Sequence, residues 1–183
     1  DYVVKDAPTI TSFTPTNGII GTVVTINGES FDAGGLVVKF GTGTVVSPTL
    51  VSPTKITATV PATATSGKLT VETVVGSAQS ATDFTVIGSP AVTSFSPTSG
   101  AIGVEVVIAG TNFIDVVNVK FNTTTVSSPN FTVVSPTQIK VNVPAGAATG
   151  KIAVTTLAGG GTSANNFTVL LPPTITSFSP VSG

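Results

Sequence analysis

The stretch Ile10-Thr11-Ser12-Phe13-Thr14-Pro15-Thr16-Asn17-Gly18 recurs twice in the 183-residue chain. It returns as Val92-Thr-Ser-Phe95-Ser-Pro97-Thr-Ser-Gly100 and again as Ile175-Thr-Ser-Phe178-Ser-Pro180-Val-Ser-Gly183. The phenylalanines of successive copies lie 82 (95 − 13) and 83 (178 − 95) residues apart. Similarity at one fixed period is the signature of a repeat architecture.

The similarity between the first two copies continues beyond this opening stretch. The later matches pair Gly21, Ile26, Gly28 and Phe31 with Gly103, Ile108, Gly110 and Phe113, then Lys39-Phe40 with Lys120-Phe121, Ser52-Pro53 with Ser135-Pro136, and Phe84-Thr-Val86 with Phe167-Thr-Val169. Length changes fall between Phe31 and Lys39 and between Pro48 and Ser52. Because loops absorb insertions that a paired strand does not tolerate, both places are predicted to be loops.

The repeat predicts the domain organisation. Residues 1–7 form a lead-in, residues 8–87 a first module, residues 88–171 a second module, and residues 172–183 the start of a truncated third. Modules of this size fold without disulfides or metals. The third copy is too short to close a domain, and we expect the natural chain to continue beyond it.

Short runs of alternating apolar and polar residues predict β-strands with one buried and one wet face. In 68–72 the inward residues are Leu69 and Val71, in 138–143 the three aliphatic residues point inward, and 117–121 repeats the pattern. Val and Thr disfavour helices. We therefore expect an all-β chain of tandem immunoglobulin-like β-sandwiches, with about seven strands per module and no parallel crossovers.

The repeated residues resemble the IPT/TIG family of immunoglobulin-like domains. Its pattern, Pro-x-Ile-x-x-Phe-x-Pro-x-x-Gly followed by Gly-Thr-x-Val-x-Ile-x-Gly-x-x-Phe, is carried by Pro8–Gly18 and Gly21–Phe31, and by Pro90–Gly100 and Gly103–Phe113 with Val104 and Glu105 in place of Thr-Val. The family is a scaffold with many functions. The Cys-free tandem form most resembles secreted or surface-anchored prokaryotic repeat proteins, or similar modules on virions.

Composition excludes several classes of function. Charged residues make up 8% of the chain and its net charge is −1, with no arginine and scattered lysines, which argues against nucleic-acid binding. Neither a membrane span nor a secretion signal occurs in this segment. Cys, His, Met and Trp are absent, which removes thiol chemistry and the imidazole and sulfur metal ligands. The lack of easily oxidised residues is compatible with an extracellular location.

Two groups of residues resemble functional sites. Gly18, Gly21 and Gly28 resemble a phosphate loop, but strands rather than a helix follow them, so we interpret them as turn glycines. Glu29 and Asp32 suggest a carboxylate pair. Their counterparts Thr111 and Ile114 carry no charge, and calcium requires more oxygen ligands. We interpret these acids, and Asp115 of the equivalent loop, as solvated loop residues, and we predict no metal site.

Catalysis is not expected. A Ser or Thr nucleophile needs a positioned base, and no such grouping is visible. The chain is therefore predicted not to be an enzyme, with no catalytic, cofactor-binding or metal-binding residues and no cofactor. Lys39 and Lys120 occupy matched positions, and strand alternation places both on the wet face as plain surface lysines.

The ten phenylalanines are interpreted as core or near-core positions rather than as a sugar-stacking platform. Phe131 aligns with Leu50 at an offset of 81 (131 − 50) and has no phenylalanine counterpart. Asn122, Asn130 and Asn166 fit the glycosylation pattern, which only a eukaryotic secretory route would use.

Two hypotheses for function follow. The first is an extracellular spacer of a surface, filament or virion-appendage protein, with adhesion as a further role and neighbouring modules or subunits as partners. Short proline-containing joints, which predict a semi-rigid rod, favour it. The alternative is an accessory carbohydrate- or protein-binding module of a polysaccharide-acting enzyme.

Overall fold

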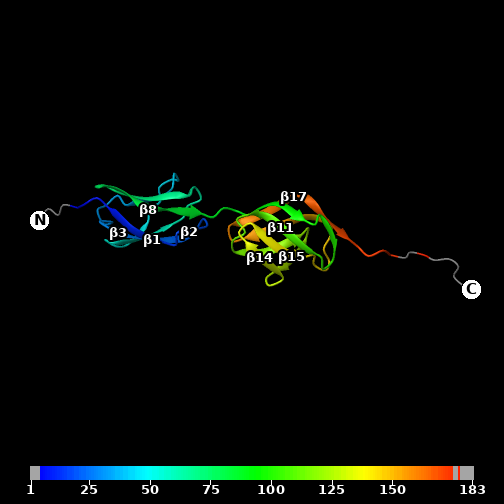
Figure 1. The fold of residues 1–183 in the computed structure, drawn as a ribbon. Coiled ribbons are helices and arrows are strands. Elements are labelled where there is room, and N and C mark those ends of the chain that lie inside the picture. The colour runs from blue at the N-terminus through cyan, green and yellow to red at the C-terminus, as the bar shows by residue number, and fades with distance from the viewer. Residues whose placement is uncertain (1–4, 175–176, 178–183) are drawn as a thin grey trace, which may run out of the picture. The chain divides into compact units, whose positions relative to one another are not determined.

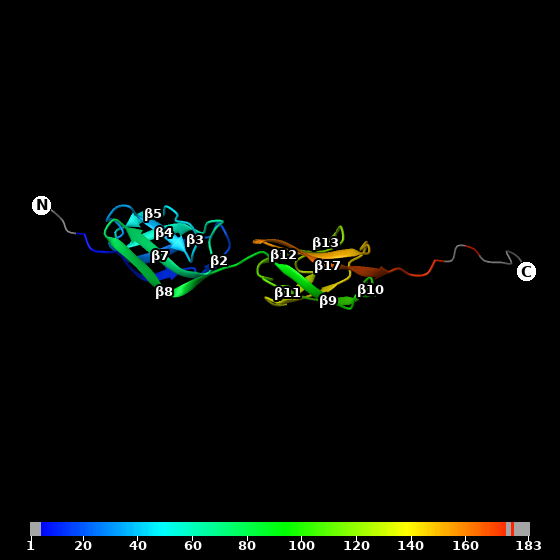
Figure 2. The ribbon, with the colours of Figure 1, turned by 90° about the horizontal axis from the view of Figure 1, so that it is seen from above.

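The computed structural model describes residues 5–174 and 177. The chain divides into two compact units, Asp1–Gly88 and Ser89–Gly183, which contain the first and the second module. Every regular element of the described residues is a β-strand, and each unit holds two packed sheets (Figures 1 and 2). The all-β, immunoglobulin-like prediction is confirmed. The module boundaries given above stay a prediction, and most of the expected third copy lies outside the described residues.

The first module has eight strands rather than the expected seven. They are β1 (Thr9–Thr14), β2 (Asn17–Gly18), β3 (Val23–Glu29), β4 (Val37–Phe40), β5 (Thr49–Ser52), β6 (Lys55–Thr59), β7 (Gly67–Thr73) and β8 (Gly76–Val86). One sheet has the order β1-β3-β6-β5 and the other the order β2-β8-β7-β4.

The second module has nine strands. They are β9 (Ala91–Ser96), β10 (Ser99–Ala101), β11 (Glu105–Thr111), β12 (Val116–Phe121), β13 (Thr124–Ser127), β14 (Phe131–Ser135), β15 (Gln138–Asn142), β16 (Gly150–Thr156) and β17 (Gly159–Leu170). Its sheets have the orders β14-β15-β11-β9 and β10-β17-β16-β12-β13. The extra strand is β13, which pairs with β12, whereas the first module has only an isolated bridge, Val38 to Val46, at this place.

Each module contains one parallel pairing that alternation alone does not reveal. β2 pairs with β8, and β10 pairs with β17. In each pair, one strand lies near the start of the module and the other is its last strand. The strands between them bring the chain back to the same side, so no helical crossover is needed. This pairing closes each module on itself.

The predicted inward positions form the two cores. Leu69 and Val71 are fully buried, and so are the aliphatic residues of 138–143. Val117 is the exception, because it remains 46% exposed. The register of β12 shifts between Val116 and Asn118, and Val116 packs against the core instead. A bulge therefore reverses the alternation at the start of this strand.

The repeated glycines have two different structural roles. Gly21 has a φ of 90° and open space around it, as expected of a turn glycine. Gly18 and Gly28 lie within strands, so their interpretation as turn glycines was wrong. A Cβ on Gly28 would stand 1.8 Å from the carbonyl oxygen of Thr9, and one on Gly110 would stand 2.0 Å from that of Ala91. A side chain is excluded there because β1 and β9 pass too close.

The two roles predict different costs of substitution. Gly28→Ala and Gly110→Ala should each destabilise their own module by more than about 3 kcal/mol, because backbone must move. Gly21→Ala should cost only about 1 kcal/mol, for its unfavourable φ. Urea denaturation followed by circular dichroism measures the loss, and hydrogen–deuterium exchange shows which module opens. Equal costs at Gly21 and Gly28 would contradict the close-approach explanation.

Candidate functional site

The acidic residues of the first module do not converge on one site. Glu29 is exposed at the end of β3, and Asp32 forms an ion pair with Lys5. In the second module Thr111 is exposed and Asp115 is exposed with a φ of 51°. In the described part of the chain, no hydrogen bond or ion pair links Glu29 and Asp32 through a common partner.

The matched lysines lie on the outer faces of their sheets, as alternation predicts. Lys39 donates to Glu72 at 2.7 Å across β4 and β7. Lys120 is half-buried on β12. The three asparagines of the glycosylation pattern, Asn122, Asn130 and Asn166, are exposed.

Most phenylalanines are core residues, as expected. Seven of them, Phe13, Phe31, Phe40, Phe84, Phe113, Phe121 and Phe167, are buried. Phe95 and Phe131 are partly buried against the core of the second module, and Phe178 lies outside the described residues. Phe131 differs from the others because it also lines a groove.

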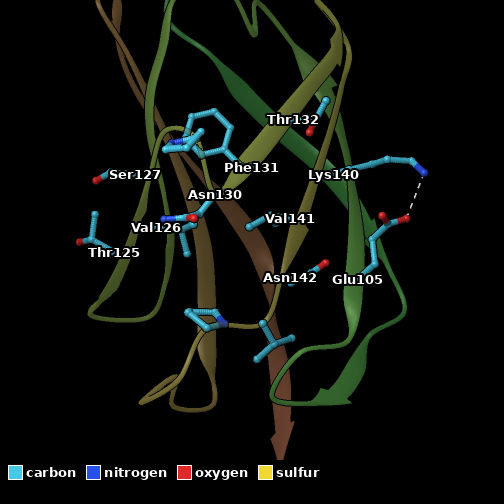
Figure 3. A pocket seen from close by; sticks show the side chains of 13 residues that line it. Glu105, Thr125, Val126, Ser127, Asn130, Phe131, Thr132, Lys140, Val141 and Asn142 are labelled. Carbon is cyan, nitrogen blue, oxygen red and sulfur yellow. Dashed lines mark ion pairs between the residues drawn. The ribbon is translucent and has the colours of Figure 1, made fainter.

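This groove of the second module has a volume of about 620 Å³. Residues of the two edge strands β13 and β14 contribute to its lining. In Figure 3, Thr125, Val126 and Ser127 stand along one side, Lys140 and Glu105 stand on the other, and Val141 lies between. The lining residues are Glu105, Thr125, Val126, Ser127, Pro129, Asn130, Phe131, Thr132, Lys140, Val141, Asn142, Val143 and Pro144.

Strand pairing shows how the groove arises. Leu50 pairs with Ile56 in the first module, and Val133 pairs with Ile139 in the second. Because Ile56 and Ile139 are counterparts (139 − 56 = 83), Leu50 corresponds to Val133 rather than to Phe131. The sequence alignment of Phe131 with Leu50 was therefore wrong. The two extra residues of the second module are Asn130 and Phe131, and both line the groove.

The predicted loop nature of this length change is only partly right. The insertion follows Pro129: Asn130 precedes β14, whereas Phe131 is the first residue of this edge strand and pairs with Val141. As an edge strand, β14 pairs with β15 alone. Extra residues at its start therefore disturb the pairing of no other strand. The inserted Phe131 packs against the border of the core and also lines the groove.

The groove combines an apolar floor with a polar rim. Val126, Val141 and Val143 are buried beneath it. The rim carries hydroxyl and amide side chains together with an ion pair of 3.0 Å between Lys140 and Glu105. These groups donate and accept hydrogen bonds without a net charge, which suits a neutral polyhydroxyl ligand or an extended peptide.

The described residues contain neither a metal cluster nor a membrane-spanning helix. Within 5–174 and at 177, no three His, Cys, Asp or Glu side chains gather closely enough to hold a metal ion. That same part of the chain contains no helix with the length and hydrophobicity to span a membrane.

Asp32 has a perturbed titration. A hydrogen bond from Lys5, supported by the charge of that lysine, holds the pKa of Asp32 below its usual range, while partial desolvation opposes the shift. The lead-in is thereby attached to the loop after β3. Because the folded-state pKa lies below the unfolded value, this contact stabilises the fold above the unfolded pKa and is lost as pH falls through the folded pKa.

Lys5→Gln should return the pKa of Asp32 toward the ordinary aspartate value, because the charged donor is removed. Carbon-13 NMR titration of the Asp32 carboxyl measures this shift. Lys68→Gln, which removes the partner of Asp83, serves as the control and should leave Asp32 unchanged. An unaltered Asp32 titration in Lys5→Gln would contradict the assignment.

The chain is similar to several solved structures. The extracellular region of plexin A4 matches with a TM-score of 0.52 and 22% identity, over 97% of this chain and 17% of that protein. A crystal structure with xylogluco-oligosaccharide matches with a TM-score of 0.48 and 27% identity, over 91% of this chain and 41% of that one. SGBP-B from a xyloglucan utilization locus in Bacteroides uniformis matches with a TM-score of 0.45 and 23% identity, over 88% and 49%.

The chain therefore spans less than half of each of these proteins. A search of curated protein sequences finds no match. The family model described as IPT/TIG domain matches twice, over residues 8–86 and 90–169. The chain belongs to the IPT/TIG domain family, of which it carries two members in tandem.

Proposed function

We propose that this chain is a non-catalytic spacer region of an extracellular or cell-surface protein. The observation that carries the proposal is the nature of what the two modules share. Both keep the same core phenylalanines and the same close-approach glycines, while their acidic residues differ. Repetition of a framework without repetition of a site is what a spacer requires.

The internal organisation of each unit supports this role. Each module has its own hydrophobic core, and its first and last strands pair with strands of the same module. A module that has its own core folds by itself, so it can be added or removed without unfolding its neighbour. Length is then adjusted by the number of copies.

If the chain is a spacer, its function depends on the length that each module adds and not on the sequence of that module. The chain is displayed on yeast with a biotin-acceptor peptide at its far end. Deleting residues 88–171 should lower capture by streptavidin-coated beads several-fold, whereas free streptavidin should still label the peptide, because only reach is lost. An unrelated immunoglobulin-like module of equal length should restore capture. Failure of that replacement would contradict the spacer role.

A second candidate function, accessory carbohydrate binding, is favoured by the groove of the second module. Two residues of its lining, Asn130 and Phe131, have no counterparts in the first module. The groove ion pair is also specific to the second module, since Val23 and Thr57 stand in the positions of Glu105 and Lys140. A binding surface is expected where copies of one framework differ.

Blocking the groove tests this candidate. Asn142→Trp places a bulky ring at the rim without entering the core, since Asn142 is exposed. It should abolish retention of the chain on a neutral glycan array. Thr59→Trp, the matched exposed position of the first module (142 − 59 = 83), should leave retention unchanged. Equal retention of both variants would show that the groove is not the binding site.

A further inference from the structure

The outer face of β12, β16 and β17 in the second module differs electrostatically from its counterpart in the first. We define the lysine face as Lys120 and Lys151 with the neighbouring side chains Asn118, Ala153, Thr155 and Asn166. Strand pairing places Lys120 opposite Ala153 and Lys151 opposite Asn166. Lys120 and Lys151 are thus diagonal neighbours on adjacent strands, with Cα atoms roughly 7–8 Å apart.

On the corresponding face of the first module, the two lysines form ion pairs with carboxylates of the same face. Its lysines are Lys39 and Lys68, the counterparts of Lys120 and Lys151. Lys39 lies 2.7 Å from Glu72, and Lys68 lies 3.4 Å from Asp83. Each positive charge on this face is therefore matched by a carboxylate on the neighbouring strand.

The second module keeps both lysines and lacks both carboxylates. At the positions of Glu72 and Asp83 it carries Thr155 and Asn166 (offset 83 in each case). Among the described residues no carboxylate lies within 4.0 Å of Lys120 or Lys151. Two ammonium groups therefore remain on one flat face, surrounded by hydroxyl and amide groups.

We propose that the lysine face binds an acidic polysaccharide of the uronate class. A polyuronate presents carboxylates along an extended chain with hydroxyls between them. Those carboxylates complement the two ammonium groups, and the hydroxyls complement Thr155 and Asn166. The site is separate from the groove and goes beyond the spacer role.

The chemistry of this face favours a glycan over the other polyanions. Protein interfaces draw most of their affinity from aromatic and arginine anchors, and the lysine face has neither. A nucleic acid would require a longer row of cations to displace its condensed counterions. Two lysines among small polar side chains suit a ligand with spaced charges and many hydroxyls.

The whole chain is tested with polygalacturonate by affinity electrophoresis at low ionic strength. Polygalacturonate should retard it, and dextran should not. Lys120→Gln with Lys151→Gln should weaken binding about tenfold, because two exposed ion pairs with the ligand are lost. Binding should also weaken as salt rises toward about 0.15 M.

Charge exchange between the modules provides the sharpest control. Thr155→Glu with Asn166→Asp gives the second module the carboxylates of the first and should weaken binding as strongly, although both lysines remain. Glu72→Thr with Asp83→Asn makes the opposite change in the first module and should strengthen binding by creating a second face. Asp83 and Asn166 are exposed, and Glu72 and Thr155 are partly exposed on the outer face, so these substitutions should leave the melting temperature nearly unchanged.

Three results would overturn the proposal. They are an absence of retardation by polygalacturonate, equal binding by the double-lysine variant, and tighter binding of poly-glutamate than of polygalacturonate. Asn142→Trp should leave polygalacturonate binding intact, so failure of the groove hypothesis is distinguishable from failure of this one. Loss of reach in the display experiment likewise reports on the spacer role alone.

Discussion

In each module three phenylalanine rings tie the two sheets together, and the rest of the sandwich is arranged around them. Phe84 stands edge-on to Phe40 with ring centroids 5.2 Å apart and contacts Phe13 of the opposite sheet at 6.4 Å. Phe167 repeats this arrangement with Phe121 at 5.3 Å and Phe95 at 6.1 Å. Such tilted pairs add about 0.5–1.5 kcal/mol to the burial of each ring.

This aromatic contact limits where the copies can differ. A change beneath the rings leaves a cavity or forces the sheets apart, with costs of about 3–5 kcal/mol for loss of a phenylalanine. The glycines at 28 and 110 are restricted in the same way, because the strand beside each leaves no room for a Cβ. Outer faces and edge strands are free of both restrictions, and there the modules diverge.

The two sites of divergence have different physical characters. The groove results from an insertion beside an edge strand, so it is a change of shape with a compensated ion pair at its rim. The lysine face results from substitutions at constant shape, in which carboxylates give way to neutral groups. An exposed ion pair contributes only about 0–1 kcal/mol to stability. The second module can therefore acquire a charged surface while its fold remains that of the first.

The repeat, the all-β class and most inward positions can be read from the sequence alone, because burial of one face imposes a period of two on the residues of each strand. The sequence did not reveal the bulge that turns Val117 outward, the parallel closure of each module, or the true counterpart of Leu50. Those depend on which residues pair across strands, and pairing partners are distant in sequence. The groove and the lysine face were likewise decided by the tertiary structure. Neither is a motif, since each exists only where strands bring separated residues to one edge or one face.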